Sequence, residues 1–256
     1  MSSPVSTAFQ SPTPGATSRR WLYTLVILPA VVAWMVLWWF GSSPSGRYFQ
    51  HEELATNKSS APLVLIGWVV MITAMMLPST APLLAVFRRV VGARPDPNRL
   101  VVAVIAGYGA VWTLVGGIAI LGDSIIHLLV DASSTTSVAD RWIAPAVLAL
   151  AGVYQFTPLK RRCVTSCQSP FVFVSRHWRG NDPRWDAFRL GVAHGWFCVG
   201  CCWTIMLTMF AVGMGNLGWM LLLGAVMGVE KNVASARWLG PTVGVGLLVG
   251  AAVMAF

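Results

Sequence analysis

Long stretches without a charged side chain constrain this sequence more than any other feature. The longest of them, residues 190–229, contains no Asp, Glu, Lys or Arg. A helix needs roughly 20 mostly apolar residues to cross a bilayer. Charged residues make up only 11% of the 256 residues, whereas soluble domains contain about 25%. The sequence therefore predicts an all-α fold, a polytopic membrane helical bundle.

The uncharged stretches also give the positions of about seven expected transmembrane helices. Residues 190–229 are too long for one span, and Gly213–Gly218 interrupts them because Gly and Asn favour turns. We therefore divide this stretch between two helices. The expected helices cover 21–40, part of 59–87, 100–122, 142–159, 188–212, 217–233 and 238–256.

The distribution of Lys and Arg predicts a cytoplasmic N-terminus, because cytoplasmic loops carry an excess of basic residues. With the N-terminus inside, the segments that face the cytoplasm hold 15 of the 18 basic residues, and only Arg47, Lys58 and Arg141 fall outside. Basic residues at helix ends suit anionic lipid, whereas nucleic acid needs a basic stripe. We therefore expect the lipid bilayer and no nucleic acid as a partner, and a multi-pass location in the bacterial inner (plasma) membrane.

The chain divides into a short tail and one domain. Residues 1–18 are rich in Ser, Thr and Pro, which predicts a disordered tail. Residues 19–256 are expected to form a single transmembrane helical domain, in which 160–187 is the largest cytoplasmic loop. The first apolar run ends in Trp38-Trp39-Phe40 without the small residues of a cleavage site. We interpret it as a retained helix and not as a signal peptide.

Metal-ligand side chains gather on the expected helix at 188–212. It contains His194, Cys198, Cys201 and Cys202 within nine residues, and Met209 beyond them. At about 100° per residue, these side chains fall within an arc of about 100°. Thiolate and thioether sulfur are ligands for Cu(I), and thiolate and imidazole also suit zinc. Cys and Met are also ordinary buried residues, so packing is the alternative interpretation.

Three further groups could add ligands. Cys163 and Cys167 form a C-x-x-x-C pair just before this helix, a weak signal alone because zinc motifs usually have two such pairs. Met75 and Met76 precede a proline that can kink their helix; core packing is the alternative for them.

Glu230 ends the expected helix at 217–233, where a carboxylate needs a partner. The partner could be Lys231 or a loop arginine, or the carboxylate could help to neutralise a bound cation.

Several motifs resemble one bacterial family, the predicted metal-binding integral membrane proteins (domain of unknown function 2182). These motifs are MITAMMLP at 71–78, PLKRRCVTSCQSP at 158–170, GVAHGWFCVGCCW at 191–203, GWM at 218–220 and EK at 230–231. The resemblance implies metal binding but no defined reaction. The candidate metal ligands that match the motifs are Met75, Met76, Cys163, Cys167, His194, Cys198, Cys201, Cys202 and Glu230.

The donor set favours a transition metal ion, with copper favoured over zinc because Met and clustered Cys suit a soft ion. We expect a membrane protein that transports the ion or delivers it to a partner protein, with a metal donor or acceptor as the partner. Two alternatives stay open. The cysteines could serve a membrane thiol oxidoreductase, or the chain could be a non-catalytic assembly subunit. The sequence therefore favours a protein that is not an enzyme, without deciding it.

Overall fold

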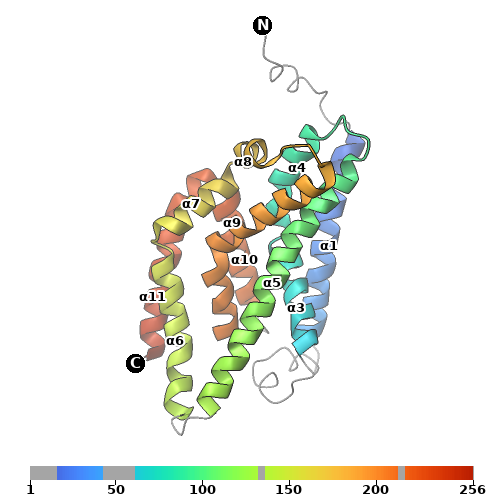
Figure 1. Ribbon diagram of the computed structural model, residues 1–256. Helices are drawn as coiled ribbons and strands as arrows, with labels where there is room; N and C mark the ends of the chain where they lie inside the picture. Colours follow the sequence, from blue (N-terminus) through green and yellow to red (C-terminus); the bar gives the residue numbers. More distant parts are fainter. Residues whose placement is uncertain (1–15, 43–60, 132–135, 213–216, 256) are drawn as a thin grey trace.

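The computed structural model describes residues 16–42, 61–131, 136–212 and 217–255, and within these ranges the chain forms helices and no strands (Figure 1). The predicted all-helical membrane bundle is therefore confirmed. The expected disordered tail lies almost wholly outside the described residues, and so does most of the expected turn at 213–218. The elements are α1 (Ala16–Ser42), α3 (Ala61–Met75), η3 (Pro78–Thr80), α4 (Ala81–Val90), α5 (Pro97–Asp131), α6 (Thr136–Tyr154), α7 (Pro158–Gln168), α8 (Pro170–His177), α9 (Pro183–Val212), α10 (Leu217–Asn232), η4 (Ala234–Trp238) and α11 (Leu239–Ala255).

Four helical stretches among the described residues are long and apolar enough to cross a membrane. They are Arg20–Phe40, Pro97–Gly122, Pro183–Met209 and Ser235–Ala255. Two bent pairs of helices, α3 with α4 and α6 with α7, raise the number to six if each pair counts as one span. The helix α10 has 16 residues, fewer than the roughly 20 that a span needs. The expected number of seven is therefore not confirmed.

The two bends arise where proline interrupts the backbone hydrogen bonds. The helix axis turns by 45° between α3 and α4 and by 65° between α6 and α7. Pro78 begins η3, which leads into α4, and Pro158 begins α7; proline has no N–H to donate to the preceding turn. At the second bend the Thr157 side chain accepts a hydrogen bond from the backbone of Lys160 and so caps α7.

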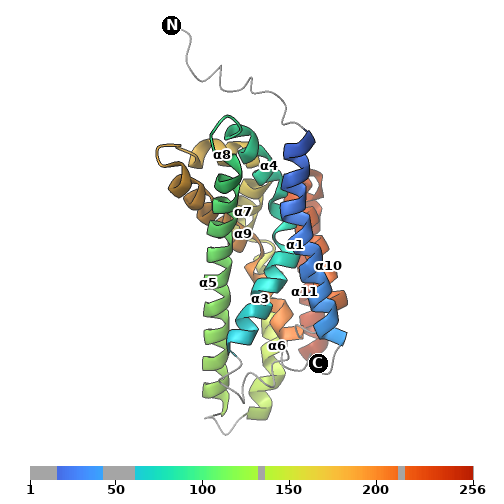
Figure 2. The same cartoon turned by 90° about the vertical axis from the view of Figure 1, so that its right-hand side faces the viewer.

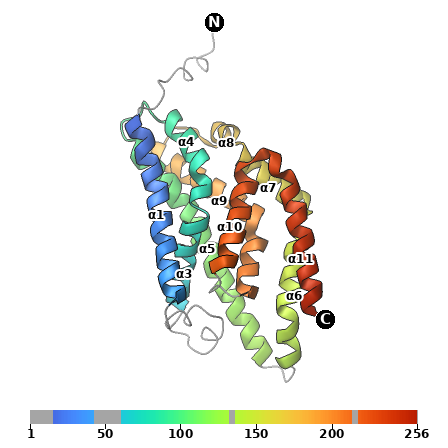
Figure 3. The same ribbon diagram turned by 180° about the vertical axis from the view of Figure 1, so that it is seen from behind.

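The segment 160–187, which we expected to be a loop, is largely helical and contains α7, α8 and the start of α9. These helices lie at one end of the bundle, together with the start of α1 and the end of α4 (Figures 1 and 3). The C-terminal end of α11 points toward the other end. Basic side chains such as Arg88, Arg161 and Arg176 therefore gather at the end that carries α7 and α8.

The helix α5 extends along most of the molecule and packs closely on α9 (Figure 2). Two glycines permit this approach. A Cβ atom at Gly107 would overlap the carbonyl of Phe188, and one at Gly191 would overlap the carbonyl of Val104. Small residues at helix interfaces in membranes allow such close packing. The contact fixes the position of α9, which carries most of the sulfur atoms described below.

Candidate metal centre

Three cysteines of α9 bring their sulfur atoms together inside the bundle. The Sγ atoms of Cys198, Cys201 and Cys202 all lie within 4.8 Å of one another, and the exposed fraction of each side chain is 2% or less. Spacings of three and four residues place side chains on one helical face. The thiols of Cys201 and Cys202 donate to the carbonyl of Cys198 at 3.0 and 2.9 Å. We call these three residues the cysteine group.

Seven methionine side chains belong to the same core cluster as the cysteine group. They come from three elements that lie around α9 or belong to it, and all of them are buried in the same core cluster. Thioether sulfur is a soft donor that suits Cu(I), although methionine is also a common core residue. The methionines of this cluster are Met71, Met75 and Met76 of α3 and the segment after it, Met206 and Met209 of α9, and Met220 and Met227 of α10.

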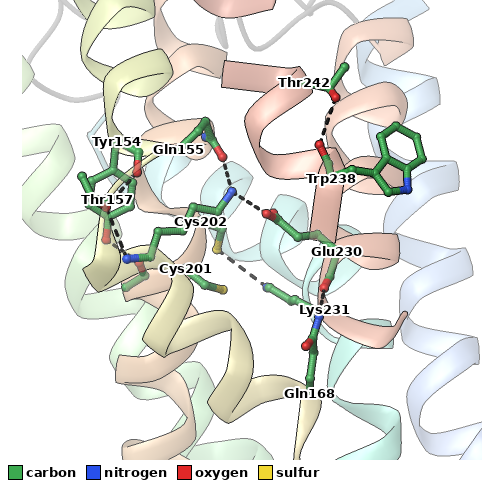
Figure 4. Close-up of polar contacts among 12 residues, drawn as sticks. Tyr154, Gln155, Thr157, Gln168, Cys201, Cys202, Glu230, Lys231, Trp238 and Thr242 are labelled. Carbon is green, nitrogen blue, oxygen red and sulfur yellow. Dashed lines mark hydrogen bonds and ion pairs between the residues drawn. The ribbon is translucent and has the colours of Figure 1, made fainter. Parts of the chain in front are cut away.

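Lys231 of α10 places its amine among these sulfur atoms. Its Nζ atom donates to Cys198 Sγ at 2.9 Å and to Met76 Sδ at 3.2 Å, and it lies 3.7 Å from Cys202 Sγ. Its side chain is 4% exposed. Figure 4 shows Lys231 directed at the cysteines of α9. A buried amine is costly without polar partners, so the sulfur atoms account for its place in the core.

The tyrosine of α5 completes the surroundings of Cys198. The hydroxyl of Tyr108 and Cys198 Sγ share a hydrogen bond of 3.1 Å. Cys198 thus has two polar neighbours from other helices, Tyr108 and Lys231. Both residues were absent from the sequence-based candidates. They are separated from Cys198 by 90 and 33 residues, so no helical spacing linked them to it.

The partner of Glu230 is not Lys231, although Lys231 was one of the two kinds of partner considered from the sequence. Its carboxylate forms an ion pair with Lys160 of α7 at 2.8 Å, and Lys160 also donates to the side chain of Gln155. Two consecutive residues of α10 therefore contact different parts of the structure: Glu230 contacts α7, and Lys231 contacts the cysteine group (Figure 4). The carboxylate already has a cation as its partner.

His194 is buried one turn before Cys198, with 4% of its side chain exposed. Its ring centroid lies 5.7 Å from that of Tyr108 and 5.4 Å from that of Phe173. It is not part of the compact cysteine group. Among the described residues its Nδ1 atom has no hydrogen-bond partner, which leaves this nitrogen available as a ligand.

The cysteines of α7 lie beside the cysteine group. Cys163 is 7% exposed and packs on Gly200 of α9, where an added Cβ atom would lie 2.6 Å from Cys163 Sγ. Cys167 is partly buried against the same core cluster. All five cysteines are free, so their thiols are available to bind a metal.

The arrangement is suited to a soft monovalent ion. Three buried thiols with thioethers near them offer two or three sulfur ligands, which Cu(I) accepts. Ionised thiols in an apolar interior are expensive, and a bound cation offsets that cost.

The sequence was compared with protein families, curated proteins and solved structures. The family described as PpoB2, copper chaperone, matches residues 65–254. Neither a curated protein nor a solved structure matches the chain. The matched range contains every candidate ligand named above, from Met75 to Glu230.

Proposed function

The chain belongs to the PpoB2 family of copper chaperones, and from this premise we propose that it binds Cu(I) inside the membrane and delivers it to an acceptor protein. The observation that carries the proposal is the cysteine group, three buried Sγ atoms within 4.8 Å of one another. Cu(I) favours such sulfur ligands. Zinc would also accept them, but the methionines around the group favour copper.

Cys198 and Cys202 form the centre of the proposed site. Both lie near Lys231 Nζ, and two thiolates around Cu(I) leave one net negative charge. The ammonium group of Lys231 would balance that charge in a medium that solvates it poorly. Coordination of Cu(I) by the sulfur atoms would replace the hydrogen bonds that Lys231 Nζ now donates to them. Lys231 is therefore proposed as a counter-charge to the bound ion and not as a ligand.

The remaining candidates suggest further stations for the ion, beside the centre on α7 and beyond it along α9. Cys163 and Cys167 lie on α7, at the end of the bundle that carries most of the basic residues. Met206 and Met209 continue along α9 in the other direction, and Met209 is about 16 Å from Cys198 at about 1.5 Å per residue. Exchange of Cu(I) between neighbouring sulfur atoms would move the ion along this line. We propose that the end with α7 and α8 lies on the cytoplasmic side of a bacterial inner membrane.

The metal content of the protein tests the proposal. The full chain, purified anaerobically in detergent, should contain about one copper per chain, and the variant with Cys198, Cys201 and Cys202 all changed to Ser should contain little. Elution volume and helical circular dichroism should match between the two proteins, which excludes misfolding. A wild-type protein without copper, or a triple variant with full copper content, would overturn the proposal. Thiol oxidation coupled to a quinone would instead favour the oxidoreductase alternative.

A further inference from the structure

A cavity of about 450 Å³ lies between α7, the end of α10 and the start of α11, separate from the cysteine group. The charged and amide side chains that line it are those of Gln155, Lys160, Arg161, Gln168, Glu230 and Arg237. Gln168 donates from its side chain to the carbonyl of Glu230 at 2.8 Å and so ties α7 to α10. The described residues that line the cavity include no cysteine or methionine, so copper binding gives no reason for it.

The charges on the cavity wall are mostly positive. Lys160 and Glu230 neutralise each other in their ion pair. Arg161 and Arg237 remain, and both are exposed at the cavity. Arg161 makes a hydrogen bond to the carbonyl of Phe156 at 3.1 Å, which fixes its position without neutralising its charge. The cavity therefore has an excess of two positive charges.

A buried donor without a partner adds a second, independent feature. Gln155 is 3% exposed, and its carbonyl oxygen accepts a hydrogen bond from Lys160. Its Nε2 atom has no hydrogen-bond partner among the described residues. Buried polar groups are nearly always satisfied, so this amide leaves a free donor in a residue that lines the cavity. An anion would accept from Gln155 and also meet the two guanidinium groups.

The position of the cavity indicates which anions can reach it. The bend of 65° between α6 and α7 turns α7 away from the direction of the spanning helix. Nearby, Trp238 is 64% exposed and Leu159 is 56% exposed. Exposed tryptophan is typical of the membrane–water interface, where lipid phosphate groups are concentrated. The volume lies in the range of about 300–1,000 Å³ usual for small-molecule sites and exceeds the needs of a bare phosphate ion.

We propose that this cavity is a binding site for a phosphate-bearing ligand, with its phosphate held between Arg161 and Arg237. Guanidinium groups bind phosphate through paired hydrogen bonds. The amide of Gln155 would donate a further hydrogen bond to the ligand. A phospholipid headgroup and a soluble phosphate ester share this chemistry, and basic pockets between helices at this depth suit lipid headgroups. The site stands independently of copper binding.

Native mass spectrometry of the full chain in detergent tests the site with phosphatidylglycerol, and with diacylglycerol as a probe that lacks the phosphate. The test variant is Arg161→Gln with Arg237→Gln. The matched control is Arg162→Gln with Arg176→Gln, which removes the same charge from exposed residues outside the cavity. We expect the test variant to bind phosphatidylglycerol about tenfold more weakly than wild type, because it loses charge-assisted hydrogen bonds. The control should change by less than about twofold.

A second arm identifies the source of the phosphate. Glycerol phosphate is titrated against the melting temperature of the same three proteins. Stabilisation of wild type and control, but not of the test variant, supports a site open to soluble esters, whereas selective lipid binding alone supports a headgroup site. The proposal is overturned if wild type binds neither phosphate probe, if it retains diacylglycerol as well as phosphatidylglycerol, or if the control loses as much binding as the test variant. Elution volume confirms that each variant is folded.

Discussion

The amine of Lys231 lies 2.9 Å from Cys198 Sγ, so α10 holds a cationic group directly against the cysteine face of α9. A lysine in the interior of a membrane bundle is rare and usually marks a functional place. Here the amine also contacts Met76 Sδ and thereby joins three parts of the chain around one cluster of sulfur atoms. The arrangement makes Lys231 the residue that best separates copper binding from ordinary core packing.

Replacing Lys231 tests its role as a counter-charge. We expect Lys231→Met to weaken Cu(I) binding by at least about tenfold, about 1.4 kcal/mol, because a negatively charged bis-thiolate copper centre then lacks its buried partner. The measurement is a competition titration against a Cu(I) chelator under anaerobic conditions. Lys231→Arg keeps the positive charge and should lose less affinity. Equal affinities of wild type and Lys231→Met would show that Lys231 only fills space.

Single serine replacements should rank the sulfur atoms of α9. We expect Cys198→Ser and Cys202→Ser each to lower the copper content of the purified protein, since a hydroxyl is a poor ligand for a soft ion. Met209→Leu should change it less, because Met209 lies about 16 Å along the helix from Cys198. Elemental analysis gives the stoichiometry, with Met209→Leu as the control for a buried substitution. Full copper content in both serine variants would show that Cys198 and Cys202 do not hold the ion, and Cys163 and Cys167 would become the better candidates.

The positions of the long helices could be predicted from the sequence because an uncharged run long enough to cross a bilayer is nearly always a helix. The helix expected at 188–212 is α9, Pro183–Val212, and the one expected at 217–233 is α10, Leu217–Asn232. The helices α7 and α8 were missed. The sequence of α7 is polar and basic enough to suit a cytoplasmic loop, and neither helix is as long as a span. Composition alone does not distinguish a short interfacial helix from a loop.

The candidate site was partly predictable for a similar reason. The cysteine group follows from spacings of three and four residues on one helix, which local geometry brings together. Tyr108 and Lys231 reach Cys198 only through the packing of α5 and α10 on α9, and a single tyrosine or a lysine at a helix end has no periodic signature. For Glu230, the sequence offered the neighbouring Lys231 as a partner. The fold instead brings Lys160 to it, because adjacent residues of a helix point about 100° apart.

The contact between α7 and α9 can be tested through Gly200. A Cβ atom there would lie 2.6 Å from Cys163 Sγ, so we expect Gly200→Ala to destabilise the protein by about 1–3 kcal/mol through overpacking. The double variant with Cys163→Ala removes the colliding sulfur and should recover most of the loss. Thermal or denaturant unfolding in detergent measures the four proteins of the cycle. Additive effects of the two changes would contradict the packing of Cys163 on Gly200.

The orientation of the bundle is accessible to thiol labelling. The α4–α5 connection and α8 lie at the same end of the molecule (Figure 1), so single cysteines at Pro95 and Ser175, introduced into a cysteine-free chain, should react alike. With this end in the cytoplasm, a membrane-impermeant thiol reagent should label them only after the cells are opened. A topology reporter fused after Phe256 should be found on the opposite, outer side of the membrane. A cytoplasmic reporter would contradict the expected seven spans.

Copper affinity should fall as the pH falls. Cu(I) binds the deprotonated form of cysteine, so protons compete with the ion for the same sulfur atoms, and binding releases protons. Each proton that the ion displaces lowers the apparent affinity by up to about tenfold for every unit of pH below the thiol pKa. Chelator competition at several pH values gives the slope, and proton release into weak buffer gives an independent count. Cys198→Ser should reduce both the slope and the released protons, because one titrating ligand is gone. Met209→Leu should leave both unchanged, since a thioether carries no proton. An affinity that does not vary with pH would mean that thiolates do not hold the ion, and the cysteine group would then be a feature of packing alone.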